Sequence, residues 1–337
     1  MKTKIQDMTS GSPGRLIILF AIPLMLGNIC QQLYTMVDTM VVGQIAGVEA
    51  LAALGAVDFL MWVVTGISTG LTQGFSIQLS QYYGAKDFEN LRKSLAHSYR
   101  LTAFIAAGVL IFSQAFASLV LTGLHTPSNI IGMSLLYLRI IFCGIPATAA
   151  YNMFASALRA MGNSKTPLTA MIIASVLNVS LDILFVAGFG WGVAGAAIAT
   201  VIAQSFSAVY CFLILRKIDI VHLTKADFMP ASGMNARLMK LGIPVVFQNI
   251  IIGVGGLVVQ YVINGYGFLF VAGFTATNKL YGLLEMAAIS YGYAIVTYVG
   301  QNLGAGRSDR IRKGVRSSML LSLLTSLIIS AAMFLFG

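Results

Sequence analysis

Long apolar runs dominate this sequence and limit what it can fold into. Nine of them occupy about residues 16–42, 51–78, 95–121, 130–158, 167–188, 192–215, 238–263, 269–298 and 315–336. Each is long enough for a helix that crosses a bilayer, which needs about 20 apolar residues. Only 9% of the residues are charged, against about 25% in an average soluble protein. The sequence therefore predicts an all-α polytopic membrane protein and excludes a soluble enzyme or a secreted disulfide scaffold.

The basic residues predict the orientation of these helices. Of the 21 Lys and Arg residues, 19 lie in or next to one set of segments, which should all face the same side of the membrane. These are the segment before the first run and the segments after the second, fourth, sixth and eighth runs. The other two, Arg139 and Lys279, lie deeper within runs. Because cytoplasmic loops accumulate Lys and Arg, this pattern predicts nine transmembrane helices with the N-terminus in the cytoplasm. Topology also accounts for the net charge of +10 without a nucleic-acid partner.

A repeated motif predicts two related lobes. Residues 80–94 and 300–314 share Gln, Gly, Ala, Arg and Lys at the same offsets, so that Gln81 and Gly84 recur as Gln301 and Gly304. Both copies follow helices that run in the same direction, as in parallel-repeat transporters. We expect a six-helix lobe over 1–216, a cytoplasmic linker over 217–236 and a three-helix lobe over 237–337. Symmetry predicts a parent protein of twelve helices, and a natural nine-helix protein is the alternative.

Small residues and prolines predict how some helices pack and bend. Gly66, Gly70 and Gly74 recur every fourth residue, which is typical of a helix face that packs closely on another helix. Pro23 and Pro146 lie inside apolar runs and are expected to bend their helices.

Ionisable residues inside the apolar runs mark a candidate site. A rise of about 1.5 Å per residue places five polar residues in the outer half of the first lobe: Asp38, Asp58, Arg139, Asp182 and Thr200. Neutral side chains would join helices at lower cost, so we predict a functional role for Asp38 and Asp182. Asp58 lies near the interface and is expected to be solvated. Arg139 is interpreted as a counter-ion or a substrate contact.

Polar stripes accompany these acids. Asn178 and Asp182 are four residues apart and share a helix face. Further stripes contain Gln31 beside Tyr34, and Thr200 with Gln204. For Gln31 and Gln204, hydrogen bonds between helices are an equally simple interpretation. Carboxylates with Asn and Thr oxygens suit a hard cation such as Na⁺, and a carboxylate can also carry a proton. Either ion could couple a gradient to a conformational change.

Motifs for enzymatic chemistry are missing from the sequence. It contains no G-x-x-x-x-G-K-[ST] phosphate loop and no histidine pair with metal-ligand spacing. We therefore expect neither an enzyme nor a cofactor, and no metal beyond a possible Na⁺ at Asp38, Asn178 and Asp182.

Together these patterns resemble the multidrug and toxic compound extrusion (MATE) family. The resemblance covers essentially the whole chain and rests on QYYGA at 81–85, QNLGA at 301–305, AIPLMLGNICQQLYTMVDTMVVG at 21–43, NVSLD at 178–182 and GAAIATVIAQ at 195–204. It implies a monomeric plasma-membrane antiporter whose two six-helix lobes alternate access. Such a protein exports cationic or amphipathic small molecules in exchange for Na⁺ or H⁺.

The resemblance also assigns residues. Asp38, Asn178, Asp182 and Thr200 match the family's first-lobe cation site, and Tyr137 is a weaker match to an aromatic residue beside it. Tyr34, Gln31, Gln204 and Arg139 are expected to tune the site or line the substrate cavity. Gln248 stands where some branches carry an acid, so no second cation site is expected in the second lobe. Lys279 and Glu285 receive no role.

Two other functions compete with export. A lipid-linked oligosaccharide flippase belongs to the wider superfamily, but it would need a cavity lined with Lys and Arg. An inactive fragment is the other alternative, since symmetry predicts three further helices.

Overall fold

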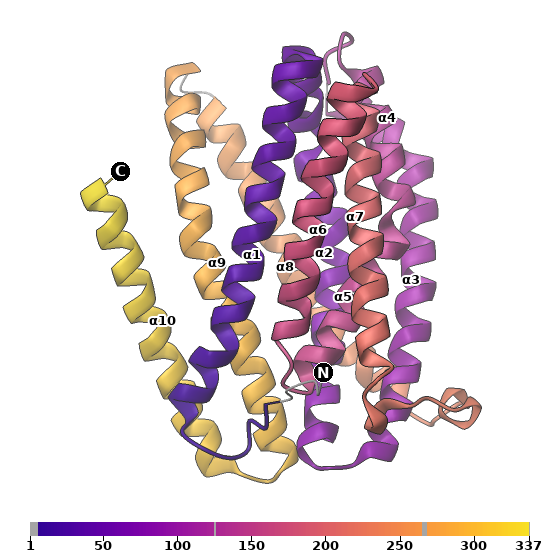
Figure 1. The fold of residues 1–337 in the computed structure, drawn as a ribbon, viewed down its shortest axis with the longest axis vertical. Helices are drawn as coiled ribbons and strands as arrows, with labels where there is room; N and C mark the ends of the chain where they lie inside the picture. The colour runs from indigo at the N-terminus through magenta and orange to yellow at the C-terminus, as the bar shows by residue number, and fades with distance from the viewer. Residues whose placement is uncertain (1–5, 125, 265–267, 337) are drawn as a thin grey trace.

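The computed structural model is a bundle of long helices aligned with one axis (Figure 1). It describes residues 6–124, 126–264 and 268–336. The α-helices are α1 (Pro13–Val41), α2 (Val48–Gly84), α3 (Phe88–Gly123), α4 (Ile131–Cys143), α5 (Ile145–Ala160), α6 (Lys165–Asp182), α7 (Gly192–Leu215), α8 (Met234–Asn264), α9 (Phe268–Gly304) and α10 (Ser308–Phe336). The described residues include no β-strand. The predicted all-α class is therefore confirmed.

The predicted count of nine membrane spans is not confirmed within the described residues. In the described residues, six helices are long and apolar enough to cross a membrane, and eight qualify if each of two bent pairs is one span. One bent pair is α4 and α5, which meet at 46° around Gly144, with Pro146 in the first turn of α5. The predicted bend at Pro146 is thus confirmed. Pro23 lies within the unbroken helix α1.

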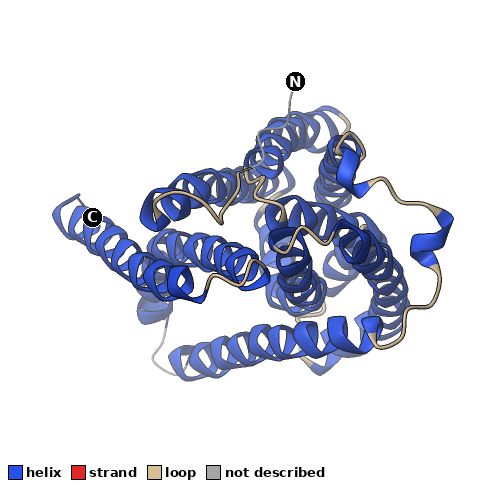
Figure 2. Ribbon diagram, turned by 90° about the horizontal axis from the view of Figure 1, so that it is seen from below, coloured by secondary structure: helices blue, strands red, loops and turns tan. Residues whose placement is uncertain are grey.

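The basic segments gather at one end of the bundle, which we call the basic end. The N-terminal segment, the turn between α2 and α3, the linker after α7 and the turn between α9 and α10 all lie there (Figure 1, bottom). Viewed from this end, α10 lies at an edge of the bundle (Figure 2). Which side of a membrane the basic end faces stays a prediction from charge.

The linker between α7 and α8 packs against α3. Arg100 Nη1 donates a hydrogen bond to the Phe228 carbonyl at 3.0 Å, and Arg92 Nε lies 3.7 Å from Asp227 Oδ1. The Asp227 carboxylate also accepts hydrogen bonds from the Thr224 amide and hydroxyl, at 2.7 and 2.8 Å. These contacts fix the linker on the first lobe instead of leaving it free in solvent.

The repeated motif meets its own copy at the basic end. A Cβ atom added to Gly84 would overlap the Gln301 carbonyl oxygen, and one added to Gly304 would overlap the Gln81 carbonyl oxygen. The two contacts are reciprocal, as duplication of the motif predicts. Glycine is needed at both positions because the backbones of α2 and α9 touch there, without room for a side chain.

The glycine stripe on α2 packs against α8, as predicted. A Cβ atom on Gly70 would lie 2.9 Å from the Val246 Cα atom, and one on Gly74 would overlap the backbone of Gly242. Asn249 Nδ2 donates to the Gly66 carbonyl at 3.1 Å within the same interface. Backbone contact therefore extends from the basic end into the middle of the bundle.

The N-terminal segment ties the two lobes together below these contacts. The Met8 amide donates to Gln301 Oε1 at 3.0 Å, while Gln301 Nε2 donates to the Ala160 carbonyl at 2.8 Å. Met8 is fully buried. Burial alone would raise the pKa of the neighbouring Asp7 carboxyl, but hydrogen bonds from Thr9 and Ser10 lower that pKa below its usual value. Asp7 therefore stays ionised and orders the turn that follows.

Replacing Gly84 with alanine should disrupt the backbone contact between α2 and α9. The added methyl group meets backbone, which cannot rotate away, so we expect a loss of about 1–3 kcal/mol in the free energy of unfolding. Thermal unfolding of the purified chain in detergent measures the effect. The matched control is Gly108→Ala on α3, where a Cβ atom meets nothing within 4 Å. That change should stabilise the helix by about 0.5–1 kcal/mol. Equal effects at both positions would contradict the proposed backbone contact.

Candidate functional site

Two buried aspartates from different helices lie at the centre of the candidate site. Asp38 comes from α1 and has 5% of its surface exposed, while Asp182 ends α6 and is fully buried. The two carboxyl groups are close enough for their charges to interact. Asn178 lies one helical turn before Asp182 and is also fully buried. The packing of α1 against α6 therefore brings together three of the predicted site residues.

Helix α7 and the short helix α4 complete the site. Asn178 Nδ2 lies 3.5 Å from Thr200 Oγ1 of α7, and Gln204 Nε2 donates to the Tyr34 hydroxyl at 3.4 Å. Tyr137 of α4 is 5% exposed and interacts electrostatically with both aspartates. The structure thus brings together all four residues predicted to bind a cation, with two of the predicted surrounding aromatic residues.

Several oxygens in this site are buried without any hydrogen bond in the described part of the chain. They are Asp38 Oδ1, Asn178 Oδ1, both carboxylate oxygens of Asp182, and Gln204 Oε1. A buried oxygen without a partner is costly, and a charged one costs more. Carboxylate and amide oxygens are also the groups that coordinate hard cations. These oxygens therefore fit the binding of a small cation, or of a proton on one of the carboxylates.

Both aspartates are followed by π-helical turns. The turn η1 (Val42–Ala46) begins four residues after Asp38, and η2 (Ile183–Gly188) begins directly after Asp182. The two turns pack against each other. π-Helical turns inside helices are frequent at functional sites, because the widened turn changes which backbone groups are paired.

Two of the residues predicted to surround the site, Arg139 and Gln31, have exposed side chains. Arg139 is exposed, and in the described chain it makes no ion pair with Asp38 or Asp182. The reason is helix geometry: Tyr137 faces the site, and two residues further along α4 the side chain has turned by about 200°. The interpretation of Arg139 as a counter-ion therefore lacks support. Gln31 is also exposed, on the same helix as Asp38.

A second site lies between the lobes. It is a pocket of about 340 Å³ lined by α2, α8 and α9, and its lining includes Trp62, Gln73, Gln248, Asn249, Glu285 and Tyr293. Among the described residues that line the pocket, Glu285 is the only one with a carboxyl group. Across the same interface, the Arg159 guanidinium lies 4.8 Å from the centre of the Tyr293 ring. The close contact of Gly74 with Gly242 lies between the pocket and the basic end, so the pocket is closed on that side.

Sequence reasoning did not place Glu285 in a pocket. The residue was noticed as an acid inside an apolar run, but helical spacing does not tell which neighbour an isolated acid faces. Polar residues on two other helices, Gln73 and Gln248, line the same pocket and supply the missing context. The Lys279 side chain lies outside the described residues.

Clusters of strong metal ligands are not part of either site. No group of three or more His, Cys, Asp or Glu residues converges within the described ranges. A cation at the first site would therefore be held by two carboxylates together with neutral amide and hydroxyl oxygens.

A bundle of membrane-crossing helices with buried carboxylates and a polar pocket between lobes defines the class of multi-pass membrane transporters. The MatE family model matches residues 23–184 and 244–337, so the chain belongs to that family.

Individual relatives agree with this assignment. The chain is 32% identical over 308 residues to Probable multidrug resistance protein YpnP of Bacillus subtilis, covering 91% of this chain and 69% of that one. It is 22% identical over 305 residues to Multidrug export protein MepA of Staphylococcus aureus, covering 89% and 67% of the two chains. Its fold is similar to that of a MOP superfamily transporter from Pyrococcus furiosus, with a TM-score of 0.93 at 23% identity, over 100% of this chain and 75% of that one.

The unpartnered oxygens make a prediction about stability. Without Na⁺ and at high pH, Asp182→Asn should stabilise the folded chain by about 1–3 kcal/mol, because it removes a buried charge without a partner. Thermal unfolding in a choline buffer measures this change. The matched control is Asp227→Asn in the linker, where the carboxylate accepts two hydrogen bonds and lies 3.7 Å from Arg92 Nε. That variant should be destabilised. A destabilised Asp182→Asn protein under the same conditions would contradict the unpartnered state of the carboxylate.

Proposed function

We propose that this protein is a cation-coupled multidrug efflux antiporter of the plasma membrane, acting as a monomer. The observation that carries the proposal is the set of five buried, unpartnered oxygens around Asp38 and Asp182. They form a site whose occupancy by Na⁺ or H⁺ changes the local free energy by a large amount. Transport needs such a difference, because an ion can drive a conformational change only if it binds the two states unequally.

The pocket between the lobes supports a cationic or amphipathic substrate. Glu285 offers one negative charge, Trp62 and Tyr293 offer aromatic faces, and Gln73 and Gln248 offer hydrogen bonds. Aromatic faces attract organic cations, and a carboxylate adds a direct charge interaction. Few charges and broad apolar contact suit a pocket that accepts many related cations.

Helix α1 connects the two sites. Asp38 lies near its end, and Asn28, ten residues earlier, donates a hydrogen bond to Ser290 Oγ of α9 at 3.2 Å. Ser290 is next to Ile289, which lines the pocket between the lobes. A cation that shifts α1 at Asp38 therefore acts on α9 beside the substrate. In the proposed cycle, the lobes rock about this contact and alternately expose the pocket.

The lining of this pocket counts against a lipid-linked oligosaccharide flippase. An anionic diphosphate would require several Lys or Arg side chains, whereas among the described residues the lining contains Glu285 and no Lys or Arg, with Arg159 beside Tyr293 at its edge.

Export of a cationic dye tests the proposed coupling. In drug-sensitive bacteria that express the chain, Asp38→Asn and Asp182→Asn should abolish ethidium export, because each removes a charge that the coupling cation neutralises. Membrane insertion, measured by immunoblot, should be unchanged. Glu89→Gln is the matched control, since Glu89 is an exposed acid that pairs only with Lys93, four residues away. Wild-type export by both aspartate variants would refute the coupling site.

The effect of Na⁺ and of pH on the melting temperature distinguishes Na⁺ from H⁺ as the coupling ion. A ligand that binds only the folded protein stabilises it by about 2.7 kcal/mol at 100 times its dissociation constant. If Na⁺ is the coupling ion, Na⁺ should raise the melting temperature of the wild-type chain and leave that of Asp182→Asn unchanged. If protons couple transport, Na⁺ should have no effect, and lowering the pH should stabilise only the wild-type chain. The absence of both effects would contradict a cation site at Asp182.

Substrate contact is tested separately at Glu285. Glu285→Gln should weaken export of cationic dyes by about tenfold, since one charge interaction in a partly desolvated site is worth on the order of 1.4 kcal/mol. Export of an uncharged amphipathic substrate should change little. The ratio of the two export rates is the measurement, and an equal loss for both substrates would contradict charge recognition.

A further inference from the structure

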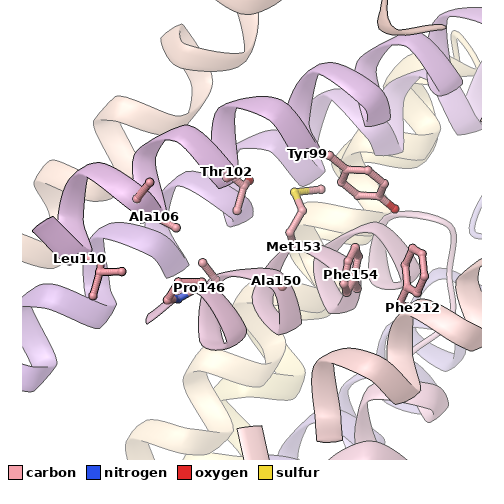
Figure 3. A pocket seen from close by; sticks show the side chains of 12 residues that line it. Tyr99, Thr102, Ala106, Leu110, Pro146, Ala150, Met153, Phe154 and Phe212 are labelled. Carbon is pink, nitrogen blue, oxygen red and sulfur yellow. The ribbon is translucent and has the colours of Figure 1, made fainter. Parts of the chain in front are cut away.

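A second cavity lies in the first lobe, apart from the cation site and the pocket between the lobes. It has a volume of about 390 Å³ and lies between α3, α5 and α7, with a lining that includes Tyr99, Ala103, Ala107, Pro146, Phe154 and Phe212 (Figure 3). Apart from the hydroxyl groups of Tyr99 and Thr102, its lining side chains are hydrocarbon or thioether. Its described lining contains no charged residue, whereas the pocket between the lobes contains Glu285.

The helices around this cavity expose apolar side chains. On α3, Phe104 is 79% exposed and Ile111 is 69% exposed, and on α7 Val209 is 55% exposed. Alanines at the cavity edge, Ala103 and Ala107, are exposed as well. In a membrane such a surface contacts lipid chains. The cavity is therefore accessible to lipid from the bilayer.

The length of the cavity matches one leaflet. Its lining on α3 extends from Tyr99 to Leu110, which is about 16 Å at a rise of 1.5 Å per residue. The hydrocarbon core of a bilayer is about 30 Å thick, so each leaflet contributes about half of that. The cavity begins near the basic end and reaches Pro146, at the break between α4 and α5. A single extended acyl chain has the shape that such a space accepts.

Basic side chains surround the end of the cavity that lies nearest the linker. The Arg216 guanidinium lies 5.6 Å from the centre of the Phe212 ring, which lines the cavity. Arg216 and Lys217 are both exposed, and Arg100, also exposed, follows Tyr99 directly. The linker also carries two acids: Asp219 is exposed and lies 3.9 Å from His222, and the buried Asp227 lies 3.7 Å from Arg92. Positive charge at the headgroup level complements an anionic lipid, whereas it offers no advantage to a zwitterionic one.

We propose that this cavity binds one acyl chain of an anionic phospholipid from the leaflet next to the basic end, with its phosphate beside Arg216 and Lys217. The apolar lining holds the chain, the aromatic rings of Tyr99, Phe154 and Phe212 lie at its ester end, and the basic residues select the headgroup. The site is separate from the proposed transport sites and does not depend on them.

Lipid binding is tested by native mass spectrometry of the purified full chain in detergent, titrated with dioleoylphosphatidylglycerol. Ala103→Phe and Ala107→Phe place a ring in the cavity from its exposed edge and should each weaken lipid binding at least tenfold. Ala115→Phe is the matched control, because Ala115 is exposed on the same helix but does not line the cavity. It should bind the lipid within twofold of wild type. Wild-type affinity in both cavity variants, or an equal loss in the control, would overturn the assignment.

The headgroup is tested by comparing phosphatidylglycerol with phosphatidylcholine of the same chains. The wild-type chain should prefer phosphatidylglycerol, and the double variant Arg216→Gln with Lys217→Gln should lose most of that preference. The control with equal net charge is Arg312→Gln with Lys313→Gln, two exposed residues on α10. An unchanged preference in the first double variant, or the same loss in both, would overturn the selection of an anionic lipid at this cavity. Unaltered melting temperatures of all variants show that folding is not the cause.

Discussion

Close backbone contact between α2 and the helices α8 and α9 is the constraint on which the rest of the structure depends. Glycines at 70, 74, 84 and 304 let these helices touch without side chains between them. Rigid contact at one end sets the distance between the lobes, so a polar pocket can exist further along the same helices. Association of helices in a membrane relies on such packing, because lipid is as apolar as the helix surfaces and provides no hydrophobic driving force.

The buried polar groups at the basic end and those around the aspartates differ in their hydrogen bonding. At the basic end, Gln301 and Asn302 are fully buried and make several hydrogen bonds to the backbone of the other lobe and the N-terminal segment. These bonds stabilise the closed end. Around Asp38 and Asp182, in contrast, buried oxygens have no hydrogen-bond partner among the described residues. The structure therefore combines a satisfied network that holds the lobes with an unsatisfied one that is open to a cation.

The first lobe has three surfaces with separate chemistry. One faces α8 and α9 and carries polar residues, one encloses the aspartates, and one carries an apolar cavity beside the bend at Pro146. The bend directs α4 and α5 to different neighbours: Tyr137 of α4 reaches the aspartates, while Phe154 of α5 lines the apolar cavity. The break between α4 and α5 thus places two kinds of site among helices α1 to α7.

The sequence by itself determined the all-α membrane class, the duplicated motif and the grouping of Asp38, Asn178, Asp182 and Thr200, because hydropathy and helical periodicity are local properties of the chain. Only the tertiary structure decided that the duplicated motifs touch each other, that Glu285 joins Gln73 and Gln248 in one pocket, and that Arg139 turns away from the acids. These outcomes depend on how helices rotate and cross. Periodicity predicts which face of a helix is buried, but not which neighbouring helix covers that face. The neighbour is determined by how side-chain volumes fit across the whole bundle.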